Sequence, residues 1–303
     1  MRPSHSHFYQ YSHENRRSTS FSHHRYSSFR PTYPQSLYTA ILTYHTGPRN
    51  VALDLGTGHA LVAREMSTSF AHVHASDPSR GMLEQARELT PTSTHPNVTF
   101  HESTAEQSPF LGDGSVDLVT AAQAAHWFDY GALWPELARV VRRGGTVAFW
   151  GYKDPVIVGY PRATALLDHC AHDPDPRYLG PYWQQPGRSI VQDKLRAVQP
   201  PEGDWEHVRR VEYEPTTGEG TRFMSAKMKM GELAEFIRTW SAFHGWQGQW
   251  PGRTRRGEGG EGEGDVVDEL MERIREEEPE LGEVVELEFG TGLVLARRCS
   301  LRQ

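Results

Sequence analysis

Two carboxylates and two glycines in the first third of the chain form the strongest candidate ligand site. Asp54 lies in a short apolar run, Gly56 and Gly58 follow it, and Asp77 comes after the next apolar run. Glycines let the backbone turn tightly and let a ligand approach without meeting a Cβ. Asp77 could accept charge-assisted hydrogen bonds from a ribose diol, and Asp54 could organise the turn. The structural alternatives are a turn-capping Asp54 and an N-capping Asp77.

Alternating strands and helices must position these residues. We expect strands over residues 51–55, 71–76, 97–101, 116–120 and 146–150. Helices are expected over residues 34–44, 60–70, 79–89 and 133–141, with Pro135 in the first turn of the last. This alternation predicts an α/β, Rossmann-like fold with a mostly parallel sheet and helices on both faces. Ligands of such sheets bind beyond the carboxyl ends of the strands.

The alternation breaks after residue 152. Two helical segments are expected within residues 154–201, around the aromatic stretch LGPYWQQPGR. A strand over residues 208–213 and helices over 233–246 and 266–277 follow. Residues 284–289 and 293–297 flank Gly290 and Gly292, and we expect them to form a closing hairpin.

The chain is expected to divide into six regions. They are a disordered tail at 1–20, an N-terminal lid at 21–50, a Rossmann-like core at 51–153, a substrate cap with core helices at 154–250, a flexible loop at 251–265, and a C-terminal helix with closing strands at 266–303.

Composition narrows the function classes. The 303 residues carry a formal net charge of -7, which argues against a general nucleic-acid binder. No apolar run approaches membrane-spanning length, so no membrane partner is expected. The two cysteines suggest neither a disulfide framework nor a zinc site, and no metal is expected. A cytoplasmic monomer or homodimer acting on a small molecule is the default prediction.

Two nucleotide cofactors compete for the glycine-rich turn. A dinucleotide site of the G-x-G-x-x-G type would need a third glycine at position 61, where Leu61 stands. S-adenosylmethionine has no phosphate and carries an ammonium, a sulfonium and a carboxylate. An acid beside the turn suits that ligand better, so the missing glycine and Asp54 favour S-adenosylmethionine over a nicotinamide dinucleotide.

Several segments resemble class I S-adenosylmethionine-dependent methyltransferases, methyltransferase type 11. Within that superfamily the sequence is similar to the fungal trans-aconitate methyltransferase-like group. The resemblance covers most of residues 21–298 and rests on FSHHRYSSFRPTYP, DLGTGHA, ASDPSRGMLEQA, FHESTAEQSP, DLVTAAQAAHWFD, ELARVVRRGGTVAFWGY, LGPYWQQPGR and RTWSAF. It implies a seven-stranded sheet with the last strand antiparallel, and a small cap. One departure is Ala60, where the family has the third glycine of its first motif.

The resemblance also implies cofactor contacts. It places the glycine-rich turn at the methionine end, the acid after the second strand at the ribose, and the residues after the third and fourth strands near the adenine and the donor end. The implied cofactor-binding residues are Asp54, Gly56, Thr57, Gly58, Asp77, Pro78, Met82, Ala105, Glu106 and Gln123. Met82 could instead be a core residue, and Glu106 a solvated loop acid.

Methyl transfer sets modest demands on the protein. The methyl carbon is already activated by positive sulfur, so alignment and exclusion of water can supply much of the rate. A carboxylate acceptor is ionised at neutral pH and needs no general base, whereas an alcohol, amine or carbon acceptor more often does. His126 and Trp127 are the catalytic candidates, although His126 could instead hold its loop and Trp127 could be core.

Substrate candidates come from the N-terminal segment and the cap. Aromatic side chains could line an apolar cleft, and an arginine could pair with a substrate carboxylate. The alternative for each arginine is a salt bridge. The substrate-binding candidates are Arg30, Tyr152, Tyr182, Trp183, Arg188, Arg238 and Trp240.

These expectations favour an enzyme that methylates a carboxylate of a trans-aconitate-like acid to give a methyl ester. An O- or C-methyltransferase of secondary metabolism is the alternative. An NAD-dependent oxidoreductase and a non-catalytic cofactor-binding protein are the further alternatives.

Overall fold

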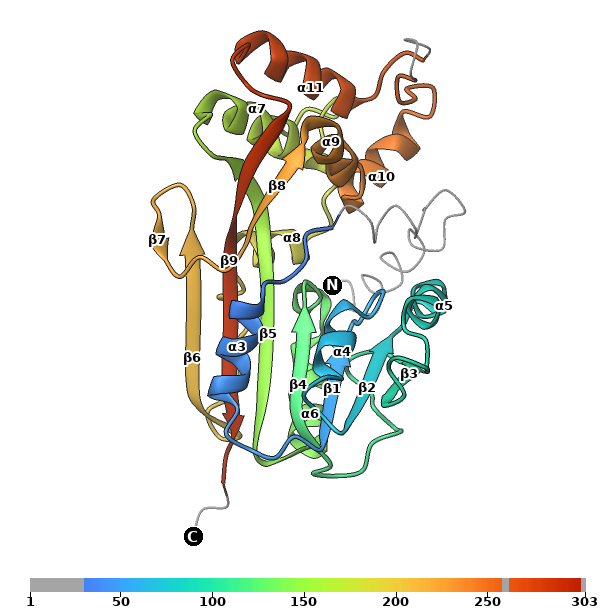
Figure 1. The fold of residues 1–303 in the computed structure, drawn as a ribbon, viewed down its shortest axis with the longest axis vertical. Helices are drawn as coiled ribbons and strands as arrows, with labels where there is room; N and C mark the ends of the chain where they lie inside the picture. Colours follow the sequence, from blue (N-terminus) through green and yellow to red (C-terminus); the bar gives the residue numbers. More distant parts are fainter. Residues whose placement is uncertain (1–29, 258–261, 301–303) are drawn as a thin grey trace, which may run out of the picture.

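The computed structural model describes residues 30–257 and 262–300, and these build one mixed β-sheet with helices on both faces (Figure 1). The sheet has nine strands in the order β3-β2-β1-β4-β5-β9-β6-β7, and β8 pairs with β9. Neighbours from β3 to β5 are parallel, and β9 runs antiparallel to both β5 and β6. The strands are β1 (Val51–Leu55), β2 (His72–Asp77), β3 (Val98–Glu102), β4 (Val116–Ala122), β5 (Val141–Ile157), β6 (Trp205–Glu214), β7 (Glu219–Gly220), β8 (Ser225–Lys229) and β9 (Val284–Arg298).

One set of helices covers both faces of the parallel half of the sheet, and a second set packs at the far ends of β5 and β9. Buried residues of α3 and α4 pack on one face, and those of α6 pack on the other. The described helices are α3 (Gln35–Tyr44), α4 (Leu61–Met66), α5 (Arg80–Leu89), α6 (Tyr130–Val140), α7 (Pro161–His172), α8 (Gly187–Gln192), α9 (Met230–Arg238), α10 (Ser241–Gln249) and α11 (Val266–Glu277), with 3-10 turns η1 (Ala125–Trp127) and η2 (Gly180–Tyr182).

The expected fold class is confirmed. The path β3-β2-β1-β4-β5-β9-β6 contains the seven strands, with the last strand of the chain antiparallel, and β7 and β8 are additions. A second hydrophobic core joins α7, α9, α10 and α11 to the far ends of β5 and β9, and this is the cap at the top of Figure 1. The expected division at residue 153 falls inside β5, because that strand continues to Ile157.

The predicted closing hairpin is wrong, because residues 284–298 form the single strand β9. The two glycines serve close approach rather than a turn. A Cβ on Gly292 would lie 2.1 Å from the carbonyl oxygen of Lys194, and a Cβ on Gly290 would lie 2.6 Å from Cε of Lys153. Glycine is therefore required at position 292, where the backbone of Lys194 packs against the extended strand, whereas at position 290 the flexible Lys153 side chain could move aside.

Two helix predictions also need correction. The helix expected over residues 233–246 is two helices, since Trp240 leaves the helical region with φ -70° and ψ 141° and begins α10 as its N-cap. Pro135 lies in the interior of α6 rather than in its first turn, because the helix already begins at Tyr130, where the Asp129 side chain accepts from the Gly131 amide. Neither boundary follows from apolar spacing alone.

Some expectations fall on residues outside the described ranges. The tail at 1–20 and residues 21–29 of the expected lid lie there, as do residues 258–261 of the low-complexity loop. Among the residues that are described, no helix is both long and apolar enough to cross a membrane.

Candidate functional site

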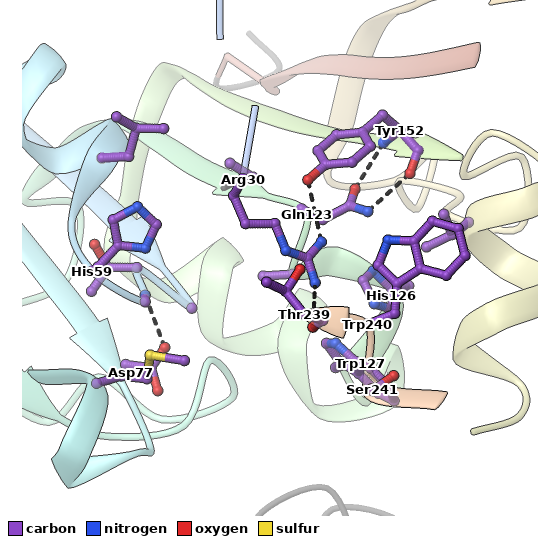
Figure 2. A pocket seen from close by; sticks show the side chains of 18 of the residues that line it. Arg30, His59, Asp77, Gln123, His126, Trp127, Tyr152, Thr239, Trp240 and Ser241 are labelled. Carbon is purple, nitrogen blue, oxygen red and sulfur yellow. Dashed lines mark hydrogen bonds between the residues drawn. The ribbon is translucent and has the colours of Figure 1, made fainter. Parts of the chain in front are cut away.

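A single pocket brings most of the predicted site residues together at the carboxyl edge of the parallel strands (Figure 2). The turn after β1 and the end of β2 form one side of it. The ends of β4 and β5, together with η1, form its floor, and α8, the α9–α10 junction and residues 30–33 complete the wall. Such an edge is where open α/β sheets bind their ligands.

The turn after β1 has the backbone geometry that its glycines predict. Gly56 has φ +62°, and a Cβ there would lie 2.6 Å from the Ala124 Cβ. Gly58 has φ +54°, and nothing would lie within 4 Å of a Cβ added to it. Ala60 also has φ +63°, in the region that favours glycine, at a cost of roughly 1–2 kcal/mol. The departure at Ala60 therefore changes the residue but keeps the backbone shape.

Asp77 joins this turn to the next helix. Its Oδ2 accepts from the Gly58 amide at 3.0 Å, and its Oδ1 accepts from the Ser79 amide at 2.8 Å. The side chain lines the pocket although the residue is only 2% exposed. Figure 2 shows the bond from Gly58 to Asp77 on one side of the pocket. Asp77 is thus a fixed carboxylate with lone pairs left for a ligand diol.

Asp54 is buried beneath the turn. Its Oδ2 accepts from the Thr57 hydroxyl at 2.6 Å, and its Oδ1 accepts from the Thr120 hydroxyl at 2.8 Å. Burial raises the pKa of Asp54 to about 6, although these two hydrogen bonds oppose the rise. The carboxylate therefore caps the turn and faces the pocket as well.

Gln123 holds the ends of β4 and β5 together. Its Nε2 donates to the Tyr152 carbonyl at 2.9 Å, and its Oε1 accepts from the Tyr152 amide at 2.7 Å (Figure 2). The residue itself has φ +49°. Both ends of the amide are thus used by the backbone of β5, while Gln123 also lines the pocket.

His126 and Trp127 lie in η1, directly beyond Gln123. Their ring centroids are 4.6 Å apart, and both residues line the pocket. The Trp127 ring packs against α8, since a Cβ on Gly187 would lie 3.1 Å from Trp127 Cζ3. The structure therefore brings both candidates to the floor of the pocket, beside α8.

The three candidate arginines have different environments. Arg30 lines the pocket, where its Nη1 donates to Tyr152 Oη at 3.3 Å and its Nη2 donates to the Thr239 carbonyl at 3.2 Å (Figure 2). Arg188 also lines the pocket and forms an ion pair with Asp154. Arg238 is outside the pocket lining and forms ion pairs with three acids that join α9 to α11.

The remaining predicted site residues divide into those that line the pocket and those that do not. Pro78, Met82, Ala105, Tyr152, Trp183 and Trp240 line the pocket together with Thr57. Glu106 and Tyr182 are not among the lining residues. Glu106 accepts from the Asp129 amide at 2.9 Å, and the Tyr182 hydroxyl donates to the Pro176 carbonyl at 2.9 Å.

Sequence reasoning missed several polar residues of the pocket, among them two histidines and an acid. His59 lies inside the glycine-rich turn, His244 lies in the first turn of α10, and Asp154 lies near the end of β5. Burial lowers the pKa of both histidines to about 4, and the positive charge of Arg30 acts in the same direction. The position of His59 within GTGHA was a usable signal, whereas nothing local marks Asp154 or His244.

The chemistry of the pocket fits S-adenosylmethionine. Asp77 offers carboxylate oxygens suited to a diol, and Gly58 leaves space in which a ligand can approach the backbone. Met82 and Ala105 are buried apolar residues that line the pocket, and apolar side chains of this kind suit an adenine ring. Asp54 contributes a carboxyl group to the pocket lining, which suits a ligand that carries a cationic amino-acid end.

Comparisons with known proteins agree with this fit. The family described as "Methyltransferase domain" matches residues 53–149. A Saccharomyces cerevisiae protein, "Probable S-adenosylmethionine-dependent methyltransferase CRG1", is 29% identical over 237 residues, covering 75% of this chain and 81% of the yeast protein. A Dictyostelium discoideum protein named as a methyltransferase is 28% identical over 218 residues, covering 72% of this chain and 74% of that protein.

A solved structure extends the similarity to the cap. It is described as "The Structure of a Putative Type II Methyltransferase from Anaeromyxobacter dehalogenans", and it is 26% identical, with a TM-score of 0.66. The match covers 89% of this chain and 98% of that one. The fold, the acid-flanked glycine turn and these relatives lead to one conclusion. The chain carries a methyltransferase domain over residues 53–149 and is an S-adenosylmethionine-dependent methyltransferase enzyme.

Proposed function

We propose that this methyltransferase acts on a carboxylate oxygen of a small organic acid and gives a methyl ester. The observation that carries the proposal is the position of Arg30. Its guanidinium group lies in the pocket between Tyr152 and the carbonyl of Thr239, across from the glycine-rich turn (Figure 2). Thr239 ends α9, and a helix C-terminus favours a cation, so this charge is well placed to meet an anionic substrate.

We also propose that the cofactor lies along the side of the pocket that Asp54 and Asp77 form. Asp77 would hold the ribose, and Asp54 with the amides of the glycine turn would hold the amino-acid end. Met82, Pro78 and Ala105 would enclose the adenine. Gln123 would support the methyl-donor end of the cofactor through its two hydrogen bonds to the Tyr152 backbone. Glu106 would act on the site indirectly, by accepting a hydrogen bond from the Asp129 amide.

The pH dependence of cofactor binding tests the position of Asp54. Its pKa of about 6 means that the carboxyl group is ionised above pH 6 and protonated below it. A cationic ligand favours the ionised form, so affinity should be constant from pH 7 to 8 and fall by up to about tenfold per pH unit below pH 6. Calorimetry with S-adenosylmethionine between pH 5 and 8 measures this. Asp54→Asn should bind weakly and lose the dependence, and an equally steep fall in that variant would assign it to another group.

A carboxylate acceptor makes few chemical demands on the chain. The bound cofactor supplies a methyl group already activated by positive sulfur. The residues of this pocket then need only hold the acceptor in line, balance its charge and exclude water. Trp127, Trp183 and Trp240 would form the apolar wall that excludes water.

His126 separates the carboxylate proposal from the alternative. An O- or C-methyltransferase acting on a weakly acidic group needs a base, and His126 is the candidate at the pocket floor. For a carboxylate, His126→Ala should keep kcat within about tenfold while cofactor affinity is unchanged. A loss of 10²–10⁴-fold in kcat, with cofactor affinity intact, would favour the alternative.

The acceptor itself needs a direct screen. Transfer of labelled methyl should be measured against di- and tricarboxylic acids, fatty acids and phenols. Base-labile label recovered from a di- or tricarboxylic acid would support the trans-aconitate-like proposal. Label recovered from phenols alone would overturn it. The oligomeric state and cytoplasmic location remain predictions.

A further inference from the structure

The end of β5 carries an ion pair that faces the pocket. Asp154 Oδ2 accepts from Arg188 Nη2, from His172 Nε2 at 2.9 Å and from Gln192 Nε2 at 3.2 Å. The Arg188 guanidinium group also lies over the Trp183 ring, with Cζ 3.7 Å from the ring centroid. The two charged side chains are only 15% and 10% exposed. Their positions are therefore fixed from several sides.

The hydrogen bonds that fix the pair use one oxygen of the Asp154 carboxylate, Oδ2, and one nitrogen of the Arg188 guanidinium group, Nη2. Within residues 30–257 and 262–300, Asp154 Oδ1 and Arg188 Nη1 have no hydrogen-bond partner. Neither atom is sealed from solvent, in contrast to Arg188 Nε. Both residues line the pocket, so its wall includes one residue with an unused acceptor atom and one with an unused donor atom.

The charge of this pair differs from that of a lone arginine. Burial alone would raise the pKa of Asp154, but Arg188 and His172 outweigh it and hold the pKa at about 2. The carboxylate is therefore ionised at any ordinary pH, and the pair has no net charge. A substrate carboxylate beside Nη1 would also be repelled by Oδ1, so the pair is poorly suited to bind one. A neutral group that donates and accepts satisfies both atoms.

We propose that the Asp154–Arg188 pair determines acceptor specificity by binding a hydroxyl or amide group of the substrate, remote from the atom that is methylated. The pair lies on α8 and β5, next to the Trp183 and Trp240 rings, whose centroids are 5.6 Å apart. Gly187 brings the same helix against Trp127, so the hydroxyl subsite adjoins the pocket floor. This inference rests on the proposed methylation of an organic acid and adds a second functional group to that acid.

Matched acids that differ by one hydroxyl group test the inference. The pairs are succinate and malate, glutarate and 3-hydroxyglutarate, and 3-phenylpropionate and 3-(4-hydroxyphenyl)propionate. Binding is measured by tryptophan fluorescence and calorimetry with S-adenosylhomocysteine present, so that no turnover is needed. In at least one pair, the hydroxylated acid should bind roughly tenfold or more tightly, as expected of a hydrogen bond to a charged group. Equal affinities in every pair, including a panel in which nothing binds, would overturn the inference.

Variants separate the pair from the rest of the pocket. Asp154→Asn should abolish the hydroxyl preference and tighten binding of the plain acid, because Arg188 then keeps an unbalanced charge. Adding Arg188→Gln should remove that gain. Asp193→Asn, whose side chain is 57% exposed at the C-cap of α8, is the matched control and should keep the preference. A preference that survives in Asp154→Asn would overturn the inference.

Folding and function have separate readouts. If Asp154→Asn does not fold, Arg188→Gln alone should lower the hydroxyl preference by roughly tenfold, since it removes Nη1, and an unchanged preference would contradict the proposal. Ester formation from the same acids tests the proposed reaction independently. If the hydroxylated acids bind more tightly but no ester forms, the proposed carboxylate reaction is wrong and the subsite proposal stands. If esters form but hydroxylated and plain acids bind equally, the subsite proposal is wrong and the proposed reaction stands.

Discussion

Replacing Asp77 by alanine should weaken S-adenosylmethionine binding by about 3–6 kcal/mol, or roughly 10²–10⁴-fold. Each charged hydrogen bond to a ribose hydroxyl contributes about 1.5–3 kcal/mol, and two are expected. The same change leaves the Gly58 and Ser79 amides without the acceptor that now fixes the turn. Calorimetry on the folded variant measures the loss, and Asp77→Asn should recover part of it because one acceptor oxygen remains.

A nearby acid provides the control. Glu84 lies on α5 with a side chain that is 59% exposed, and its ion pair with Arg80 is likewise on the surface. Glu84→Gln removes a carboxylate from the same helix–turn unit and should leave cofactor affinity within about twofold. Wild-type affinity in folded Asp77→Ala would show that the ribose is held elsewhere.

Replacing Arg238 by alanine should instead cost stability, by about 3–5 kcal/mol. Its side chain is 10% exposed and donates to Asp265 at 2.7 and 3.0 Å, to Asp268 at 2.6 Å and to Glu235 at 3.0 Å. Without it, Asp265 and Asp268 would be close together without that counter-charge, at the N-terminus of α11. Urea unfolding measures the change, while affinity for S-adenosylmethionine should be unaltered below the transition.

An exposed arginine separates this effect from a general loss of charge. Arg80, with 79% of its side chain exposed, pairs with Glu84, which is 59% exposed, and Arg80→Ala should cost less than about 1 kcal/mol. Arg238→Lys should retain part of the stability, because it keeps the charge but not the planar fork. If Arg238→Ala had wild-type stability and a raised KM for the acid, Arg238 would instead be a substrate-binding residue.

The cofactor half of the molecule was predictable because its signals are local. Asp54, Gly56, Gly58 and Asp77 are brought together by one strand–turn–helix–strand unit, whose geometry follows from short-range rules. The N-cap at Ser79 and the limits of α11 follow from the same kind of local pattern. Pairing of adjacent parallel strands then fixes which ends meet.

The substrate half depends on contacts between distant segments. Arg188, Arg238 and Arg30 have the same side chain, and only their partners distinguish them. Asp154, 34 positions before Arg188, and Asp265, 27 positions after Arg238, decide which arginine pairs with an acid. The spacing of residues around each arginine does not predict these partners, because they lie far away in the sequence.

Glycine shows the same limit within the backbone. At Gly56 it permits a positive φ, whereas at Gly292 it makes room for the Lys194 carbonyl in an extended strand. The sequence patterns G-T-G are identical at the two places. The role of glycine in the segment at 290–292 depends on the distant chain that packs against it. The predicted hairpin is wrong because the local sequence does not contain that contact.

The continuity of β5 and β9 has a consequence for motion. These strands pair from Thr146 with Arg297 to Ile157 with Leu287, with one register shift between Tyr152 and Pro155, and so run from the amino-terminal edge of the parallel strands into the cap. The cap is thus mounted on the sheet itself rather than on a linker. Amide hydrogens of these strands should exchange slowly and together in both halves. A hinge between the cap and the sheet would have to break this pairing, so we expect the two to keep their relative position when a ligand enters.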